Sequence, residues 1–238
     1  MREALVMLPG MMCDARLFGP QIAELSADTA VMVAPVTQGE RIEEIASSLL
    51  DVLPKRFALA GLSLGGIVAM EILRRAPDRV SRIALINTGP LPETPAIAAD
   101  REPRIVRARA GRMDEVMQAE FPAQSLAPGP YRGEVQELMM DMGRTLGAEV
   151  FIRQSRAMQR RKDQQATLRK CKVPALVLCG AYDTIYPVKR HEFMAELIPY
   201  ARLEVLQGSG HLPTLEQPGE VTDALRAWMR QPMMLQQV

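Results

Sequence analysis

One serine lies in a setting that suits nucleophilic chemistry. Ser63 stands in Gly61-Leu62-Ser63-Leu64-Gly65-Gly66, directly after the apolar run 57–60. Glycines two residues before and after a serine suit a sharp strand-to-helix turn that holds the serine hydroxyl in the open. Residues 64–75 predict a mostly buried helix that ends before Pro77. The pattern alone also fits an ordinary turn, but these flanking segments favour a nucleophile.

A serine hydroxyl is a weak nucleophile, so it needs a neighbouring base. The chain has two histidines. His211 lies in a glycine-rich loop after the strand-like run 201–206, a position from which it could reach over a sheet edge. His191 lies in a helical pattern among charged neighbours, and we expect it to be a solvated surface residue. His211 is therefore the candidate base.

A catalytic histidine is oriented by a third group, usually a carboxylate. Asp183 follows the continuous apolar run 174–180, which suits a strand buried on both faces. Aspartate is also common in ordinary turns. The chain order Ser63, Asp183, His211 favours the catalytic interpretation, because it is the order in one class of serine hydrolase and differs from two unrelated protease classes.

Taken together, these motifs resemble the α/β-hydrolase superfamily, of the small cap-bearing esterase and lactonase type. The resemblance rests on the Ser63 turn and on four further segments, and covers nearly the whole chain apart from residues 90–170. Those segments are Gly180-Ala181-Tyr182-Asp183, Gly210-His211-Leu212-Pro213, Ala76-Pro77-Asp78-Arg79-Val80 and Glu216-Gln217-Pro218. The family usually has eight strands, and its first hairpin is expected to be absent here.

The resemblance implies a serine hydrolase that cleaves a small carboxylic ester or lactone through an acyl-enzyme, without a metal or organic cofactor. The same triad also serves carbon–carbon bond hydrolases and acyltransferases, and some homologues sense a ligand without turnover. The implied oxyanion donors are two backbone amides, those of Leu64 and Met11. This chain has Pro9 where the family commonly has histidine, which puts the usual bracing of that loop in question but not the amide donor.

Composition limits the other functions. The chain has 238 residues and a formal net charge of +1, so nothing suggests nucleic-acid binding. No segment predicts a membrane span or a signal peptide. Three scattered cysteines lack metal-ligand spacing and suggest reduced thiols in a cytoplasm, and we expect Cys13 to be a packing residue. The expected partner is a small ester or lactone, and the expected assembly is a monomer or homodimer.

Strand-like and helix-like segments alternate, which predicts an α/β fold with a mostly parallel sheet of about six strands. The predicted strands are 4–8, 29–34, 56–60, 82–87, 174–179 and 201–206, and the predicted helices are 15–26, 41–53, 64–75, 188–198 and 218–230. Residues 1–89 and 171–238 would form the core domain, with a helical cap, 90–170, inserted after the strand ending near Asn87. The tail 231–238 is expected to fray.

The predicted cap contains helices near 96–110, 112–120, 132–146 and 148–160. Six methionines suit an adaptable apolar pocket, although most should pack the cap helices together: Met113, Met117, Met139, Met140, Met142 and Met158. The cap is also rich in basic side chains: Arg101, Arg104, Arg107, Arg109, Arg112, Arg144, Arg153, Arg156, Arg160, Arg161 and Lys162. Most should be solvated, and one pointing inward would favour a carboxylate-bearing substrate.

Overall fold

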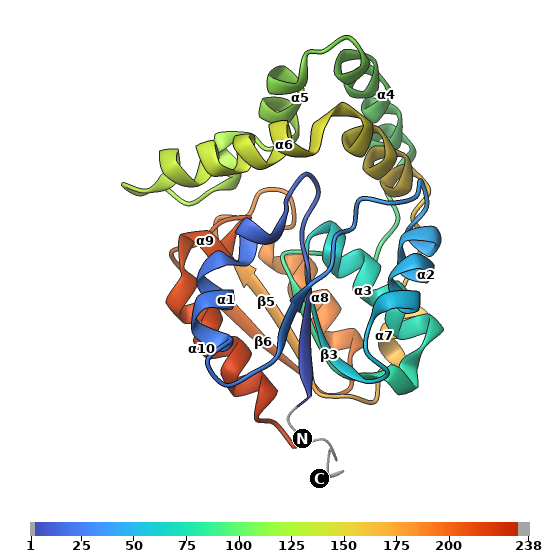
Figure 1. The fold of residues 1–238 in the computed structure, drawn as a ribbon, viewed down its shortest axis with the longest axis vertical. Helices are drawn as coiled ribbons and strands as arrows, with labels where there is room; N and C mark the ends of the chain where they lie inside the picture. The colour runs from blue at the N-terminus through green and yellow to red at the C-terminus, as the bar shows by residue number, and fades with distance from the viewer. Residues whose placement is uncertain (1–2, 233–238) are drawn as a thin grey trace.

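A six-stranded parallel sheet forms the centre of the protein. The computed structural model describes residues 3–232, and its strands run in the order β2-β1-β3-β4-β5-β6 (Figure 1). They are β1 (Ala4–Leu8), β2 (Val31–Val33), β3 (Phe57–Leu62), β4 (Val80–Ile86), β5 (Ala175–Gly180) and β6 (Ala201–Leu206). Every residue of β3, β4 and β5 is buried, as expected when helices cover both faces of a parallel sheet. The predicted α/β fold class is confirmed.

Helices cover the sheet on both faces. On one face α1 (Gly19–Leu25) packs against α10 (Pro218–Met229). On the other face α2 (Ile42–Val52), α3 (Leu64–Arg75), α7 (Gln165–Arg169) and α8 (Val188–Leu197) contact one another in sequence. Right-handed crossovers between parallel strands impose this division. None of the helices between residues 3 and 232 has the length and apolar character that crossing a bilayer requires.

Three helices between β4 and β5, with the loops that connect them, form what is called here the helical insert: α4 (Pro95–Arg109), α5 (Met113–Glu120) and α6 (Arg132–Gln159). They stand together beyond one end of the sheet (Figure 1). Helix α6 is divided at Gly147, whose φ of 78° and ψ of 176° are not helical. The break falls between the two predicted helices 132–146 and 148–160, because glycine accepts this backbone conformation at low cost.

The other differences from the predicted elements are local. Strand β2 has three residues instead of six, since it pairs only with β1 at the sheet edge. The predicted helix 15–26 begins as a 3₁₀ helix, Ala15–Phe18, before α1. The short helices α7 and α9 (Pro213–Glu216) were not predicted. Helix α7 packs against α3 and α8, although it lies within the predicted cap segment. Residues 233–238 of the tail lie outside the described residues.

Candidate active site

Ser63 occupies a strained turn between β3 and α3. Its φ of 53° and ψ of −115° are unfavourable for a residue with a side chain. A Cβ on Gly61 would lie 2.3 Å from the Gly65 carbonyl oxygen, and a Cβ on Gly65 would lie 2.0 Å from the Leu8 carbonyl oxygen. The glycines are therefore required by close backbone approach. The Thr88 hydroxyl donates a hydrogen bond to the Ser63 carbonyl at 2.8 Å, which helps to hold the turn.

His211 and Asp183 form a direct, buried contact. His211 Nδ1 lies 2.9 Å from Asp183 Oδ2, and the two residues are 1% and 4% exposed. The other oxygen, Asp183 Oδ1, accepts hydrogen bonds from the amides of Ile185 and Tyr186 at 2.8 and 3.0 Å. Burial raises the pKa of Asp183, but His211 and these donors outweigh burial and hold the pKa below its ordinary value. The carboxylate is thus suited to orienting the imidazole.

Asn87, at the end of β4, joins the loop that carries Asp183 to the loop that carries His211. Its Nδ2 donates to Asp183 Oδ2 at 2.6 Å and to the Gly210 carbonyl oxygen at 3.0 Å. Asn87 directly follows β4 and has a φ of 43°, a conformation that asparagine tolerates better than most residues. Sequence reasoning used it only to mark the end of a strand. A polar side chain directly after a buried strand was the available signal.

Glu216 braces the loop that carries His211. Its carboxylate accepts three backbone hydrogen bonds, from Gly210 at 2.9 Å, Leu212 at 2.8 Å and Ala127 at 2.7 Å. Two of these amides flank His211, and the third belongs to the helical insert. Burial raises the pKa of Glu216, and the three amide donors offset only part of that rise. Sequence reasoning cited Glu216 only as part of a motif before the last helix.

The helical insert also contacts the histidine loop directly. The amide of His211 donates to the Ser125 carbonyl oxygen at 2.7 Å. A Cβ on Gly210 would lie 2.3 Å from that same oxygen, so the glycine permits the contact. The His211 ring lies between two aromatic rings, with its centroid 6.3 Å from Phe121 and 6.1 Å from Tyr186. The insert therefore helps to set the position of the candidate base.

The loop after β1 lies beside the nucleophile turn, where the oxyanion donor was expected. A Cβ on Gly10 would lie 3.5 Å from the Ser63 Cβ. The Met12 amide donates to Gln154 Oε1 at 2.9 Å, and Gln154 Nε2 donates to the Val36 carbonyl oxygen at 3.0 Å. Gln154 belongs to α6 and is fully buried. This glutamine braces the loop that lacks the family's common histidine. Leu64 is the first residue of α3, where a backbone N–H has no acceptor within its own helix.

The expectation that His191 is a solvated surface residue is wrong. It is 0% exposed, its Nε2 accepts from the Thr88 amide at 3.1 Å, and its Nδ1 lies 3.4 Å from the Pro187 carbonyl oxygen. Burial lowers its pKa from 6.5 to about 4. A neutral imidazole satisfies both contacts, so His191 supports the backbone next to Ser63. The charged neighbours in the sequence, Lys189, Arg190 and Glu192, are exposed on the same helix, which conceals this buried position.

Packing accounts for most of the sulfur-containing side chains that the sequence singled out. Cys13 is 2% exposed, and burial raises the pKa of its thiol to about 12, which suits a packing residue. Five of the six insert methionines are buried in the hydrophobic core: Met117, Met139, Met140, Met142 and Met158. Their burial matches the expectation that most of them pack helices together.

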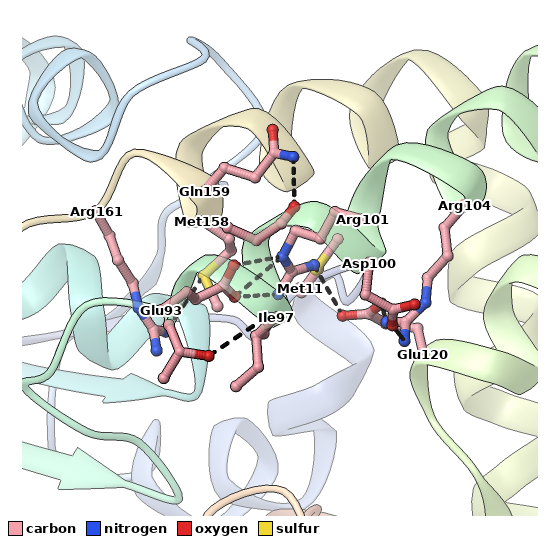
Figure 2. Close-up of polar contacts among 12 residues, drawn as sticks. Met11, Glu93, Ile97, Asp100, Arg101, Arg104, Glu120, Met158, Gln159 and Arg161 are labelled. Atoms are coloured by element: carbon pink, nitrogen blue, oxygen red, sulfur yellow. Dashed lines mark hydrogen bonds and ion pairs between the residues drawn. The ribbon is translucent and has the colours of Figure 1, made fainter.

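Two arginines of the predicted cap are buried. Arg101 is 5% exposed and pairs with Glu93 at 2.6 Å and with Glu120 at 3.1 Å. Figure 2 shows these ion pairs as dashed lines. Its Nη1 also lies 3.8 Å from Met11 Sδ, so this ion cluster joins the insert to the loop after β1. Arg161 is 8% exposed and donates to the Tyr186 hydroxyl at 2.9 Å. Arg101 is fully paired with carboxylates, whereas Arg161 bonds to a neutral group.

The candidate residues meet at one edge of the sheet. Ser63, Asp183 and His211 follow the carboxyl ends of β3, β5 and β6, and such ends of parallel strands are the usual ligand-binding edge of an open α/β sheet. The structure brings Asp183 and His211 into contact, and Asn87 and Thr88 join that pair to the Ser63 turn. Ser63 is 6% exposed, and an imidazole within hydrogen-bond reach of its hydroxyl would activate it for attack on a carbonyl.

Comparisons with known proteins show the family to which this fold belongs. The model of the alpha/beta hydrolase family matches residues 5–224. The pimeloyl-(acyl-carrier protein) methyl ester esterase of Aromatoleum aromaticum is 30% identical over 200 residues, which cover 76% of this chain and 77% of that protein. The biotin biosynthesis bifunctional protein BioHC of Teredinibacter turnerae is 25% identical over 97% of this chain, which spans only 45% of that protein's length.

A solved structure gives the same picture in three dimensions. The thermophilic esterase from Thermogutta terrifontis, determined with malate bound, is 27% identical and superposes with a TM-score of 0.88. The match covers 96% of this chain and 89% of that one. With a family model that spans most of the chain and a close structural match, the chain belongs to the alpha/beta hydrolase family.

Proposed function

We propose that this protein hydrolyses a small carboxylic ester or lactone with Ser63 as the nucleophile, His211 as the base and Asp183 as the orienting acid. The observation that carries the proposal is the buried 2.9 Å contact between His211 Nδ1 and Asp183 Oδ2, at the sheet edge where Ser63 holds a strained turn. Relatives named as esterases support ester hydrolysis. A cytoplasmic location remains a prediction from the unpaired cysteines.

The reaction would proceed in two stages. His211 takes the proton of the Ser63 hydroxyl as the oxygen attacks the substrate carbonyl, and the amides of Leu64 and Met11 bind the developing oxyanion. The tetrahedral intermediate collapses, and the alcohol leaves with the proton held by His211. Water then attacks the acyl-enzyme, giving a proton to His211, which returns it to Ser63 as the carboxylic acid departs.

We further propose that the helical insert acts as a cap that shapes the substrate site. Its residue Ser125 accepts the His211 amide, its residue Phe121 lies beside the His211 ring, and its residue Gln154 braces the oxyanion loop. An element that contacts both the base and the oxyanion loop is well placed to decide which acyl and alcohol groups fit between them.

The test is hydrolysis of a p-nitrophenyl ester series from acetate to decanoate. Ser63→Ala should abolish turnover while the protein stays folded, and Ser47→Ala, an exposed serine of α2, should retain wild-type activity as the matched control. The chain-length optimum would measure the site under the insert. Wild-type activity in Ser63→Ala would refute the assignment. No turnover of any ester by the folded wild type would refute ester hydrolysis and favour carbon–carbon cleavage, acyl transfer or ligand sensing.

A further inference from the structure

The loop after β1 contains a turn whose conformation does not suit its sequence. The Cys13 amide donates to the Gly10 carbonyl oxygen at 3.2 Å, which closes a turn with Met11 and Met12 at its centre. Met12 has a φ of 55°, whereas the φ of Met11 is not positive. A positive φ at the third position alone is the pattern of a type II turn, which normally has glycine or asparagine there. A methionine in this left-handed conformation costs roughly 1–2 kcal/mol, so the turn needs support from elsewhere.

Gln154 of α6 supplies support to the strained residue. Its side chain is fully buried and bonded at both ends, because Oε1 accepts from the Met12 amide at 2.9 Å and Nε2 donates to the Val36 carbonyl oxygen at 3.0 Å. The Met12 amide belongs to the central peptide of the turn. The orientation of that peptide distinguishes a type II turn from a type I turn. A glutamine anchored at both ends therefore holds the Met12 N–H toward α6 and the turn in its type II form.

The same turn carries the proposed oxyanion donor, the amide of Met11. A type I turn suits most residues and is the form that a methionine at position 12 would favour. Conversion to type I would change ψ of Met11 and φ of Met12 by roughly 150° each and turn the peptide between them over. Gly10 begins this turn directly beside the nucleophile, since a Cβ on it would lie 3.5 Å from the Ser63 Cβ. The form of the turn therefore decides which backbone groups face Ser63.

Other residues of the helical insert contact the turn and the residue after it. Arg101 Nη1 of α4 lies 3.8 Å from Met11 Sδ, and Figure 2 shows Met11 beside Arg101. The Asp14 amide donates to Met142 Sδ of α6 at 3.5 Å. Both α4 and α6 thus hold the loop that carries the oxyanion donor.

We propose that Gln154 is a positioning residue for the oxyanion hole. By accepting the Met12 amide, it keeps the turn in its type II form, and that form directs the Met11 amide to the oxygen on which charge develops. Gln154 acts through the turn and not on the substrate. The oxyanion hole is thus completed by the helical insert and not by the sheet and its loops alone. This inference rests on the proposed ester hydrolysis and names the residue that controls its oxyanion donor.

The first test is the kinetics of Gln154→Met, which keeps the length of the side chain but neither hydrogen bond. With p-nitrophenyl butyrate, kcat should fall about 10- to 100-fold, part of the roughly 10²- to 10³-fold loss that follows removal of a whole oxyanion donor. KM should change by less than about twofold, because the donor acts on the transition state. Gln159→Met is the matched control and should retain wild-type kcat. It removes another glutamine of α6, whose Nε2 donates to the Ala98 carbonyl oxygen at 2.8 Å within the insert.

Affinity for butylboronic acid separates positioning from general damage. The Ser63 oxygen adds to boron and His211 takes the serine proton, so the adduct is a tetrahedral anion that resembles the reaction intermediate. The inhibition constant should rise in Gln154→Met by about the factor by which kcat falls, and should not change in Gln159→Met. A fall in kcat without a loss of boronate affinity would overturn the proposal. So would a change in KM alone, or an equal loss in Gln159→Met.

Gln154→Asn keeps the test decisive if Gln154→Met does not fold. Asparagine keeps the amide but is one methylene too short to bond Met12 and Val36 together. The variant should lose kcat and boronate affinity by the same factor, with KM nearly unchanged. Wild-type values of both in folded Gln154→Asn would overturn the proposal.

Calorimetry with butylboronic acid separates this inference from the proposed reaction. If the wild type hydrolyses no ester but binds the boronic acid more tightly than Ser63→Ala does, and Gln154→Met weakens that binding, the ester hydrolysis fails and the positioning role stands. If esters are hydrolysed and Gln154→Met alters neither kcat nor boronate affinity, the positioning role fails and the hydrolysis stands.

Discussion

Glu216 offers the sharpest test of how the histidine loop is held. Its carboxylate accepts three amides, one from the helical insert and two that flank His211. Glu216→Ala leaves these donors without an acceptor, at about 1–3 kcal/mol for each donor that water does not reach. Glu216 is partly exposed, so water should rescue some of them. We expect a loss of about 3 kcal/mol in the free energy of unfolding.

Glu216→Gln separates the loss of charge from the loss of acceptors. The glutamine oxygen can take the place of Oε2, which accepts two of the three amides. Burial raises the pKa of Glu216, so the charge is held at a cost that a neutral amide avoids. We therefore expect Glu216→Gln to cost about 1 kcal/mol, well below the alanine variant.

Urea unfolding at pH 7.5 measures both losses, with the m value as a check on two-state behaviour. Ester turnover at saturating substrate should fall about tenfold in Glu216→Ala, because a displaced His211 affects the chemical step more than binding. A loss below about 1 kcal/mol in the alanine variant, or equal losses in both variants, would refute the bracing role.

Three further predictions follow from the same region. Burial lowers the pKa of His191 from 6.5 to about 4, so as the pH falls the unfolded chain takes up a proton at this residue before the folded chain does. His191 should therefore lower the free energy of unfolding by about 3 kcal/mol between pH 6.5 and pH 4 and have no such effect above pH 6.5. In urea unfolding over that range, the free energy of unfolding of His191→Gln should depend less steeply on pH than that of the wild type, and an unchanged dependence would contradict the assignment. Asn87→Ala removes a donor to Asp183 and should lower turnover about tenfold with KM nearly unchanged, whereas a pure KM effect would show that Asn87 acts on binding. Gly65→Ala places a Cβ 2.0 Å from the Leu8 carbonyl oxygen, and circular dichroism should detect no folded protein for this variant. The control Gly133→Ala, whose Cβ would have nothing within 4 Å, should fold normally. A folded Gly65→Ala would show that the turn can move.

The central strands could be predicted closely because their sequences carry a direct physical signal. A strand buried on both faces of a parallel sheet is a continuous apolar run, as in β3 and β5, and such runs stand out. Strand β2 lies at the sheet edge with all three residues only partly buried, so its limits were predicted less well. The break in α6 was predicted because a glycine marks it.

The candidate site divides in the same way. The turn at Ser63 has a steric requirement for glycine that is visible as a motif, and the structure shows the close contacts behind it. Asn87, Gln154 and Glu216 have no such signature, because each is a single polar residue whose partner is far away in the chain. The prediction for His191 was wrong because the residues directly beside it are charged and exposed, although His191 itself is buried. The roles of Ser63, Asp183 and His211 in turnover remain predictions.

The hydrogen bond from the His211 amide to the Ser125 carbonyl has a consequence for protein engineering. Grafting the helices of a related enzyme onto this sheet is an obvious route to new specificity, but the donor helices would bring their own loop into the place of residues 125–127. A chimera that exchanged helices while retaining this tripeptide would preserve the support of the histidine and of Glu216. The natural crossover points for recombination in this scaffold therefore lie inside the insert, on either side of Ser125 and Ala127, as well as at its two ends.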